Sequence, residues 1–384
     1  MTITQQEAQW IQETVEKLKT KWKPVTERNV GKIPYSSKDG VFDDYSPKDK
    51  VAWWTNGFWA GMLWQMYAST GNELYKETAK KSEIIMEKDL SGFVGLHHDV
   101  GFQYLHTAVA DYRLTGDEKA KIMGLHAASL LAGRFNPTGN FIRAWNDGNG
   151  PRGETGKKPG WMIIDCMMNI PLLYWAGKEM EDPRFTDIAN RHAETAMRVL
   201  LRPDGSCNHI GILDPETGEV ISLPGGQGYG EGSSWSRGQA WAVYGFALAF
   251  LHTGNQEFLD AAKRAAHYFL ANVAMTGYVS LVDFRAPKEP VYWDTTATAC
   301  AACGLLQIAE MVPEFEKDLY YDGAVKMLMA LSESHCDWNL KTDGILQNGT
   351  AAYWRDTDRH VPIIYGDYFY VEGILRLLGK EFMI

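Results

Sequence analysis

The sequence predicts an all-α fold, a closed ring of six antiparallel helical hairpins. Within its 384 residues one pattern recurs six times: a small or polar start, an aromatic-rich apolar helix, a tight turn and a plainer amphipathic helix. The last aromatic-rich helix has no amphipathic helix after it, whereas the N-terminus begins with an amphipathic segment that lacks a partner. We therefore expect twelve helices, and we expect the two ends of the chain to pair and close the ring.

The first, second and fourth hairpins share a turn in which Thr-Gly is followed by Asn or Asp. Glycine can adopt the left-handed conformation that ends one helix, and the following Asn or Asp can cap the next. The aromatic-rich helices expected before these turns cover residues 54–67, 98–112 and 235–251. The turns themselves contain Gly71-Asn72, Gly116-Asp117 and Gly254-Asn255.

The other hairpins follow from different break signals. A helix over Ile163–Ala176 is expected to end before Glu181-Asp182-Pro183, because proline suits the first turn of the next helix. A fifth hairpin begins at Thr295 and continues past Pro313 into a second helix over 317–332. The sixth hairpin consists of an aromatic-rich helix over 365–378 and the N-terminal segment 5–22, which pairs with it.

The composition predicts a single domain over residues 1–384. Hydrophobic residues make up 45% of the chain and aromatic residues 12%, enough to bury a large core, and no linker or low-complexity tract divides it. The net charge of -10 argues against a nucleic-acid partner, because no basic stripe interrupts the acidic balance. Capture of an anionic substrate would therefore depend on local Arg and His side chains.

Three observations bear on location. The N-terminal segment Met1–Gln6 has no basic start followed by an apolar core, so no secretory signal is expected. No apolar run approaches the roughly 20 residues needed to cross a bilayer, so no membrane partner is expected. The five cysteines are scattered and do not form a disulfide framework. We expect a cytoplasmic protein, either a monomer or a homodimer.

No metal and no cofactor are expected. Cys300 and Cys303 have the spacing of a redox or zinc pair, but they lie in a small-residue helix without a second pair, which favours core packing. His97 and His98 are adjacent, and adjacent side chains at a helix start point in different directions, whereas helical metal sites prefer spacings of three or four. We favour a hydrogen-bonding role beside Asp99.

The starts of the aromatic-rich helices should converge on one mouth of the ring, and two carboxylates lie there. Asp165 has apolar neighbours, and burial would raise its pKa and suit a proton donor, whereas a role as helix cap would lower the pKa. Asp99 opens another such helix, where capping is again the alternative. Two carboxylates that face each other across a pocket are typical of sugar chemistry.

Aromatic residues near these starts are candidates for the pocket wall. Trp54, Trp145 and Trp241 lie next to loops and can stack on sugar rings. Other tryptophans, such as Trp59 and Trp64, have the spacing of one buried helix face and are expected in the core.

Arg237 also lies near an inner-helix start. Its guanidinium can pair with Asp99 or Asp165, or bind a substrate carboxylate through two parallel hydrogen bonds. The Gly-rich stretch 224–232 has no phosphate-binding pattern. We expect it to form a flexible lip over the pocket.

These motifs resemble those of the unsaturated glucuronyl hydrolases of glycoside hydrolase family 88. The similar stretches follow one another along almost the whole chain: WTNGFW at 54–59, HHDVGF at 97–102, IIDCMMNIPLLYWA at 163–176, WSRGQAW at 235–241 and GDYFYVE at 366–372. The resemblance implies an (α/α)6 barrel in a cytoplasmic enzyme. It also implies that the substrate is an oligosaccharide whose non-reducing end carries the 4,5-unsaturated uronic acid left by a polysaccharide lyase.

The resemblance also assigns roles. The residue matching Asp165 acts as general acid and base, and the residue matching Asp99 is the second essential carboxylate, near the hydroxyls of the unsaturated sugar. Proton delivery to C4 of the enol ether and hydration at C5 give a hemiketal that opens and releases the remaining sugar, although an epoxide-like route stays open. Positions around the ring match Trp54, Trp145, His209, Gln227, Arg237 and Trp241, and we add His98, Tyr353 and Trp354 as substrate-binding residues.

The chain departs from the family pattern in two places. Tyr365 stands where Trp is common, and the segment 348–355 lacks the Ser and Lys cluster of relatives that act on sulfated fragments. The second departure argues against a preference for sulfated disaccharides. Neither the accepted linkage nor the adjacent sugar follows from the sequence.

Two other functions fit the same residues. A sugar epimerase on a helical toroid would use His98 and His209 as proton carriers. A carbohydrate-binding protein without catalytic activity would use the carboxylates only to accept hydrogen bonds from hydroxyl groups.

Overall fold

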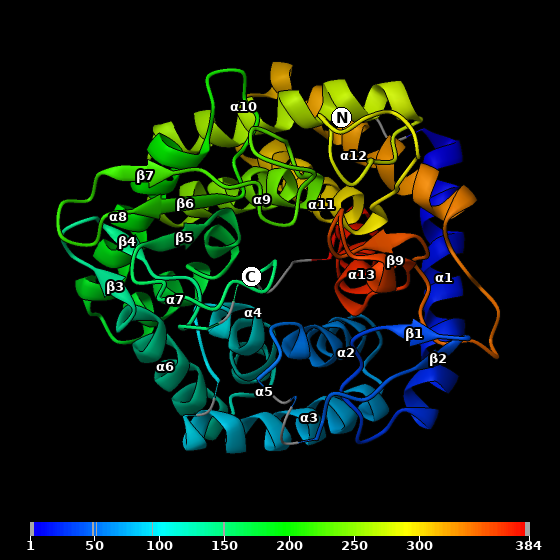
Figure 1. Ribbon diagram of the computed structural model, residues 1–384. Helices are drawn as coiled ribbons and strands as arrows, with labels where there is room; N and C mark the ends of the chain where they lie inside the picture. Colours follow the sequence, from blue (N-terminus) through cyan, green and yellow to red (C-terminus); the bar gives the residue numbers. More distant parts are fainter. Residues whose placement is uncertain (1–3, 48–49, 51, 94, 149, 381–384) are drawn as a thin grey trace.

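Helices alternate along the chain between an inner and an outer ring, which makes the protein an (α/α)6 barrel (Figure 1). The structure is a computed structural model, and it describes residues 4–47, 50, 52–93, 95–148 and 150–380. In these residues the segments α4, η1 and α5 join end to end, so that the chain forms twelve helices. The predicted fold class and helix number are confirmed.

The inner helices are rich in aromatic and small residues and are buried on nearly every side. They are α2 (Asn56–Thr70), α4 (Val100–Tyr104) with η1 (Leu105–Val109) and α5 (Ala110–Thr115), α7 (Pro171–Glu179), α9 (Ser236–Thr253), α11 (Thr295–Met311) and α13 (Ile364–Leu377). The outer helices are α1 (Gln5–Arg28), α3 (Glu73–Gly92), α6 (Glu118–Ala132), α8 (Pro183–Leu200), α10 (Gln256–Val273) and α12 (Glu314–Ser334). Helix α1 packs on α13 and thereby closes the ring, as expected (Figure 1).

The three glycine turns have the predicted chemistry. Gly71, Gly116 and Gly254 end their helices with φ of 68°, 74° and 68°, the left-handed conformation that glycine adopts without a Cβ clash. The residues that follow cap α3, α6 and α10, because each side-chain oxygen accepts a hydrogen bond from the backbone N–H two residues later. These caps are Asn72, Asp117 and Asn255.

The third hairpin differs from the prediction. The single helix expected over Ile163–Ala176 is instead a strand, β5 (Trp161–Ile163), a 3-10 helix, η2 (Ile164–Met168), and then α7. Pro171 starts α7, because it has no N–H to donate and its φ suits a first helical turn. Asp165 therefore lies in the 3-10 helix before the inner helix rather than within it.

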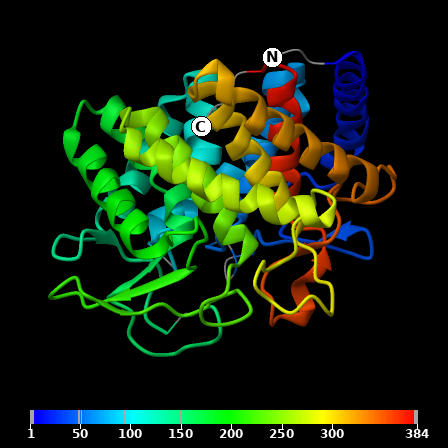
Figure 2. The same cartoon turned by 90° about the horizontal axis from the view of Figure 1, so that it is seen from above.

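Short strands and long loops gather at one end of the barrel, the lower part of Figure 2. They form four small antiparallel sheets, which the helical repeat did not predict because each strand has only two to four residues. The strands are β1 (Ser37–Lys38) with β2 (Val41–Phe42), β3 (Phe135–Asn136) with β4 (Phe141–Ile142), β5 with β6 (Ile210–Leu213) and β7 (Val220–Ser222), and β8 (Gly349–Thr350) with β9 (Arg359–Val361). Two single 3-10 turns, η3 (Ala274–Thr276) and η4 (Asp356–Asp358), complete the described elements.

The core fills the space between the two rings. Cys300 and Cys303 are fully buried free thiols in α11, and the Cys303 thiol donates to the carbonyl of Phe369 at 3.1 Å. This position agrees with the core-packing interpretation of the pair.

In the described part of the chain, no helix is both long and apolar enough to span a membrane. The first three residues, on which the expected lack of a signal peptide partly rests, lie outside the described residues.

Candidate active site

A cavity of about 620 Å³ opens at the end of the barrel that carries the strands and loops. Its wall combines aromatic rings, glycine-rich loops and a few charged groups, which suits a ligand with both apolar ring faces and polar substituents. Five of the predicted site residues line it: Trp54, Asp99, Trp145, Gln227 and Arg237.

Asp99 stands at the N-cap position of α4 but does not cap the helix with its side chain. It is 6% exposed, and its Oδ1 accepts a hydrogen bond from Asn169 Nδ2 at 3.0 Å. Burial, and next the negative charge of Asp165, raise the pKa of Asp99 to about 8. Because the side chain makes no capping hydrogen bond, the capping alternative for Asp99 is wrong, and burial favours the neutral form of this carboxyl group.

Asp165 is held close to His209 by the sheet below the cavity. Strand β5 pairs with β6, and the backbone N–H of Ile164 donates to the carbonyl of His209 at 3.0 Å. Asp165 is 7% exposed, and its Oδ2 lies 3.4 Å from His209 Nε2. Asp165 is not an N-cap, because that position in η2 belongs to Ile163.

The backbone determines which nitrogen of His209 carries the proton. Gln227 donates its backbone N–H to His209 Nδ1 at 3.0 Å. A backbone N–H can only donate, so Nδ1 must be the acceptor and the proton of the neutral ring lies on Nε2. His209 therefore presents an N–H group toward Asp165.

Asn169 connects the two carboxyl-bearing segments, and the residue-by-residue prediction missed it. Its Nδ2 donates to Asp99 Oδ1 at 3.0 Å and to the backbone carbonyl of Asp165 at 3.3 Å. Its Oδ1 accepts from the backbone N–H of Phe102 at 2.7 Å. The only signal in the sequence was its position four residues after Asp165, inside a stretch that carries the family resemblance.

The two adjacent histidines both contact Asp99, contrary to the geometric argument made from their spacing. His97 Nδ1 lies 3.3 Å from Asp99 Oδ2, and His98 Nε2 lies 3.4 Å from Asp99 Oδ1. The three groups could share a metal ion, since their ligand atoms lie within 4.8 Å of one another. Residues 97–99 precede α4, so the side-chain directions of a helix do not apply to them.

One hydrogen bond joins these groups, and it involves His97 and Asp99. His97 Nδ1 accepts from the backbone N–H of Asp99 at 3.4 Å. Burial, and next the charge of Arg134, lower the pKa of His97 to about 3, so that this ring is neutral beside Asp99. His98 is fully buried behind Asp99, and it does not reach the cavity wall.

Arg237 does not pair with Asp99 or Asp165, as one sequence reading allowed. It is 1% exposed, and its guanidinium lies over the rings of Trp235 and Tyr365, with centroid distances of 4.4 Å and 5.0 Å. Nη1 and Nη2 donate to the backbone carbonyls of Thr350 and Ala351 at 2.8 Å and 2.7 Å. Asp294, whose Oδ2 lies 3.4 Å from Nη1, is the carboxylate partner.

This arrangement leaves one edge of the Arg237 guanidinium without a full set of hydrogen bonds, although its Nε is buried. Arginine has five N–H donors, and Nε has no hydrogen-bond partner among the described side chains and backbone. Nε–H and the second N–H of Nη2 lie side by side, which is the spacing that matches the two oxygens of a carboxylate.

The glycine-rich stretch 224–232 contributes Gln227 to the cavity wall, and it is anchored at many points. Its residue Gln227 donates through Nε2 to the carbonyl of Ala351 at 2.7 Å and accepts at its own carbonyl from the backbone N–H of Tyr353 at 2.9 Å. Asp283 accepts from the backbone N–H groups of Tyr229 and Ser234, both at 3.0 Å. These bonds do not support the expected flexibility.

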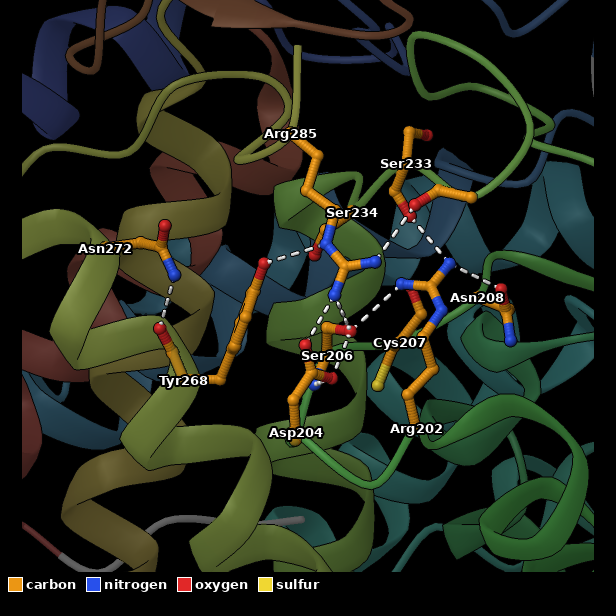
Figure 3. A network of polar contacts seen from close by, with 12 residues as sticks. Arg202, Asp204, Ser206, Cys207, Asn208, Ser233, Ser234, Tyr268, Asn272 and Arg285 are labelled. Atoms are coloured by element: carbon orange, nitrogen blue, oxygen red, sulfur yellow. Dashed lines mark hydrogen bonds and ion pairs between the residues drawn. The ribbon is translucent and has the colours of Figure 1, made fainter.

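A polar network holds the C-terminal end of this stretch from outside (Figure 3). Arg202 Nη2 donates to the carbonyl of Ser233 at 2.8 Å, and Arg285 Nη1 donates to the carbonyl of Gly232 at 3.1 Å. Ser206 joins the two arginines, because its Oγ accepts from Arg202 Nη1 at 3.0 Å and from Arg285 Nη2 at 2.9 Å (Figure 3).

The predicted aromatic contacts divide into two groups. Trp54 and Trp145 are half-buried and line the cavity, with Trp54 against Tyr365 at 5.1 Å. Trp241 is fully buried and packs between Phe102 and Phe369 at 5.1 Å and 5.6 Å. The expectation that Trp241 stacks on a sugar ring is not supported, because core side chains cover its indole.

Tyr353 and Trp354 contact the anchored stretch rather than the cavity wall. The Trp354 ring is 37% exposed, and its Nε1 donates to the carbonyl of Gly226 at 3.2 Å. Tyr353 packs edge-on against Tyr229 and Tyr292 at 5.0 Å and 5.3 Å. In the described residues, both side chains support the loop that carries Gln227.

The sequence has a clear family match. The profile described as Glycosyl Hydrolase Family 88 matches residues 25–299. The unsaturated glucuronyl hydrolase of Bacillus sp. (strain GL1) is 39% identical over 329 residues, which cover 84% of this chain and 86% of that protein. The chain belongs to glycoside hydrolase family 88. It is therefore an enzyme, as the resemblance implied.

Solved structures of family 88 enzymes share the fold. The unsaturated glucuronyl hydrolase of Streptococcus agalactiae superposes with a TM-score of 0.90 and 29% identity, covering 100% of this chain and 95% of that one. An Asp-to-Asn variant of that enzyme, complexed with dGlcA-GalNAc6S, gives a TM-score of 0.82 and 27% identity, covering 97% of this chain and 93% of that one. The (α/α)6 barrel is thus common to this chain and its family 88 relatives.

Proposed function

We propose that the protein removes the 4,5-unsaturated uronic acid from the non-reducing end of oligosaccharides produced by polysaccharide lyases. The observation that carries this proposal is the pair of buried carboxyl groups, Asp99 and Asp165, joined through Asn169. Asp99 lines the aromatic cavity, whereas Asp165 is not part of the cavity wall. The proposal draws support from the relatives, one of which is named an unsaturated glucuronyl hydrolase and another of which was solved with a dGlcA-containing disaccharide.

The carboxyl pair holds the proton that the reaction needs. The substrate is an enol ether, so protonation of C4 places positive charge on C5 and the ring oxygen. Because burial, and next the charge of Asp165, raise the pKa of Asp99 to about 8, the pair favours a form that keeps a proton. We assign proton delivery to Asp165, which takes up the proton of Asp99 when the substrate binds. The Asp99 carboxylate that remains stabilises the cation and binds hydroxyl groups.

After protonation, the ionised Asp165 can accept a proton from the water that attacks C5. His209 faces Asp165 with its Nε2–H group, so it can donate a hydrogen bond to the carboxylate that forms. The hydrated product is a hemiketal, which opens and releases the remaining sugar.

Arg237 supplies local attraction for the uronic acid carboxylate. The protein has a formal charge of -10, so its overall field repels an anionic substrate. The free edge of Arg237, formed by Nε–H and Nη2–H, can bind the carboxylate through two parallel hydrogen bonds. Trp54 and Trp145 provide apolar faces for the sugar rings.

A substrate panel tests the reaction directly. Lyase-generated chondroitin, hyaluronan, heparin and gellan-type fragments are incubated with the protein, and the absorbance of the conjugated alkene is followed. We expect loss of absorbance and release of the second sugar, with faster turnover of unsulfated than of sulfated disaccharides. Persistent absorbance with all four fragments would contradict the proposal. Conversion of saturated amino sugars would instead indicate an epimerase, and tight binding without product a carbohydrate-binding protein.

Replacement of Asp165 by Asn tests its role as acid and base. The substitution keeps the size of the side chain but removes the exchangeable carboxyl proton, so turnover should be abolished while the circular dichroism spectrum is unchanged. Asp318→Asn, in the exposed part of α12, is the matched control and should keep full activity. Turnover by the Asp165→Asn protein would remove Asp165 from the mechanism.

We also propose a cytoplasmic location, which the thiol chemistry supports. All five cysteines are free, and four of them are buried as thiols. A reducing compartment keeps thiols in this form. Fractionation of the native host cells tests the location, and size-exclusion chromatography with light scattering distinguishes monomer from homodimer.

A further inference from the structure

We infer that Asn169 is the positioning residue that frees the Asp99 carboxylate for the reaction by capping helix α4 in its place. This inference rests on the proposed function, since it concerns how one member of the carboxyl pair becomes available to substrate.

The first turn of α4 needs an acceptor that Asp99 does not provide. The first N–H groups of an α-helix have no partner inside the helix, and an N-cap Asp normally accepts one of them with its side chain. Asp99 occupies the N-cap position, yet its backbone has φ -72° and ψ 5° rather than the extended conformation of a capping residue. Its side chain makes no capping hydrogen bond.

Asn169 provides the missing acceptor from another segment of the chain. Its Oδ1 accepts from the backbone N–H of Phe102, three residues after Asp99, at 2.7 Å. An N-cap side chain would normally accept from this position. Phe102 N–H can only donate, so the atom that faces it must be the oxygen of the amide, which fixes the orientation of the Asn169 side chain.

The same orientation directs the amide NH2 group at the carboxyl pair. Nδ2 donates to Asp99 Oδ1 at 3.0 Å and to the backbone carbonyl of Asp165 at 3.3 Å. One buried side chain thus accepts a hydrogen bond from the first turn of α4, donates one to Asp99 and donates another to the segment that carries Asp165. Asn169 is 0% exposed, so water does not compete for these bonds.

The backbone of α4 is shaped for this contact. Gly101 lies directly against Asn169, and a Cβ added at residue 101 would meet the Asn169 Cα at 2.4 Å. Only glycine permits this approach, which brings the Phe102 N–H within reach of the amide.

Two substitutions at Asn169 test the acceptor and the donor of its side-chain amide separately. Asn169→Ala removes both the acceptor and the donor. We then expect the Asp99 side chain to accept a hydrogen bond from the first turn of α4 and so to cap the helix. Asn169→Asp keeps an acceptor for Phe102 but replaces the donor by an oxygen, which faces Asp99 Oδ1 and can donate only when it is protonated.

The expected result for Asn169→Ala is a fall in kcat of about 10²-fold or more, because misplacement of a reacting group by about 1 Å has effects of this size. KM should change only a few-fold, since the Arg237 and tryptophan contacts remain. Asn190→Ala is the matched control: it removes one side-chain hydrogen bond, from the Tyr174 hydroxyl at 2.9 Å, between α7 and α8 of the same hairpin and should leave kcat unchanged.

Asn169→Asp gives a readout that a purely structural role would not change. Its activity relative to the wild type should rise as the pH is lowered, because protonation of the new carboxyl group restores the donor to Asp99. The relative activity of Asn169→Ala should not depend on pH. A flat ratio for both variants, or wild-type kcat in Asn169→Ala, would overturn the inference.

A crystal structure of Asn169→Ala distinguishes failure of this inference from failure of the proposed function, because it needs no substrate. We expect the Asp99 carboxylate to accept a hydrogen bond from the Phe102 N–H. An unmoved Asp99 would refute the positioning role even if the wild type consumes unsaturated disaccharides. A moved Asp99 in a protein that consumes none would refute only the proposed function.

Discussion

Asp99 is a carboxyl group whose burial has a direct effect on both stability and activity. Its surroundings offer one strong donor, Asn169 Nδ2, and a neutral imidazole, His97, which does not offset a negative charge. Because the pKa in the folded protein is raised to about 8, the folded protein binds more protons than the unfolded chain between about pH 4 and about pH 8. The contribution of this group to stability therefore falls as the pH rises through that range.

Replacement of Asp99 by Asn should stabilise the protein while abolishing turnover. The neutral amide can accept from Asn169 and donate to His97 Nδ1 without the cost of a buried charge. We expect an increase in Tm of roughly 2–4 °C near pH 8 and little change near pH 4, as measured by thermal unfolding across that range. Asp318→Asn is again the exposed control. A Tm that falls at pH 8 would show that Asp99 is stabilised as an anion.

The same pKa predicts the alkaline side of the pH profile. If catalysis uses the proton held by the carboxyl pair, kcat/KM should decrease as the pH rises through about 8, where Asp99 loses its proton. Initial rates with an unsaturated disaccharide, measured from about pH 6 to about pH 9.5, check this expectation. Circular dichroism at each pH excludes unfolding as the cause. Constant kcat/KM up to pH 9.5 would contradict the proton assignment.

Among the elements, the glycine-rich stretch 224–232 has the most direct influence on the catalytic pair. It carries the Gln227 N–H that fixes the tautomer of His209, and His209 in turn faces Asp165. Asp283, the arginine network and Tyr353 hold the stretch in place. The element therefore acts as a rigid support for His209.

Gly226→Ala tests this support. A Cβ at residue 226 would lie 2.1 Å from His209 Nδ1, so the stretch must shift and the hydrogen bond from Gln227 must weaken. We expect kcat/KM to fall about 10-fold or more, in line with the effect of misplaced catalytic groups. Gly230→Ala lies in the same stretch, where a Cβ would meet nothing within 4 Å, and should leave kcat/KM unchanged. Equal effects of the two substitutions would rule out this role of the stretch.

For the whole molecule, closure of the ring joins the two ends of the chain, because α13 packs on both α1 and α2. Trp22 of α1 is fully buried and packs edge-on against Trp59 of α2, with ring centroids 6.2 Å apart. The single-domain organisation over 1–384 stays a prediction, and the contacts of α1 with the C-terminal hairpin are consistent with it.

Trp22→Ala should destabilise the whole barrel. Removal of a fully buried indole costs about 3–5 kcal/mol through lost burial and cavity formation. Trp10→Ala on the same helix removes a half-buried indole and should cost less than about 2 kcal/mol. Urea unfolding followed by fluorescence measures both values. If the two substitutions cost the same, the buried contact of Trp22 with α2 does not stabilise the barrel more than an ordinary half-buried side chain does.

The arrangement of helices followed from the sequence because local chemistry specifies it. Glycine turns such as Gly71-Asn72 end one helix and cap the next with groups that lie within a few residues of each other. The position of Asp165 relative to the inner helix was not predictable in this way. Helix α7 begins only at Pro171, and residues 161–163 before Asp165 form a strand that pairs with β6. That pairing joins segments more than forty residues apart, which a local pattern does not record.

The sequence by itself determined the ring of hairpins, its closure, and the two aspartates and Arg237 as residues near its mouth, because periodicity and turn residues act locally. Only the tertiary structure decided what each of these groups contacts. The partner of Arg237 is Asp294, the groups around Asp99 are His97, His98 and Asn169, and the indole of Trp241 lies inside the core. Hydrogen bonds and burial depend on which distant segments meet, and a pKa such as that of Asp99 depends on both.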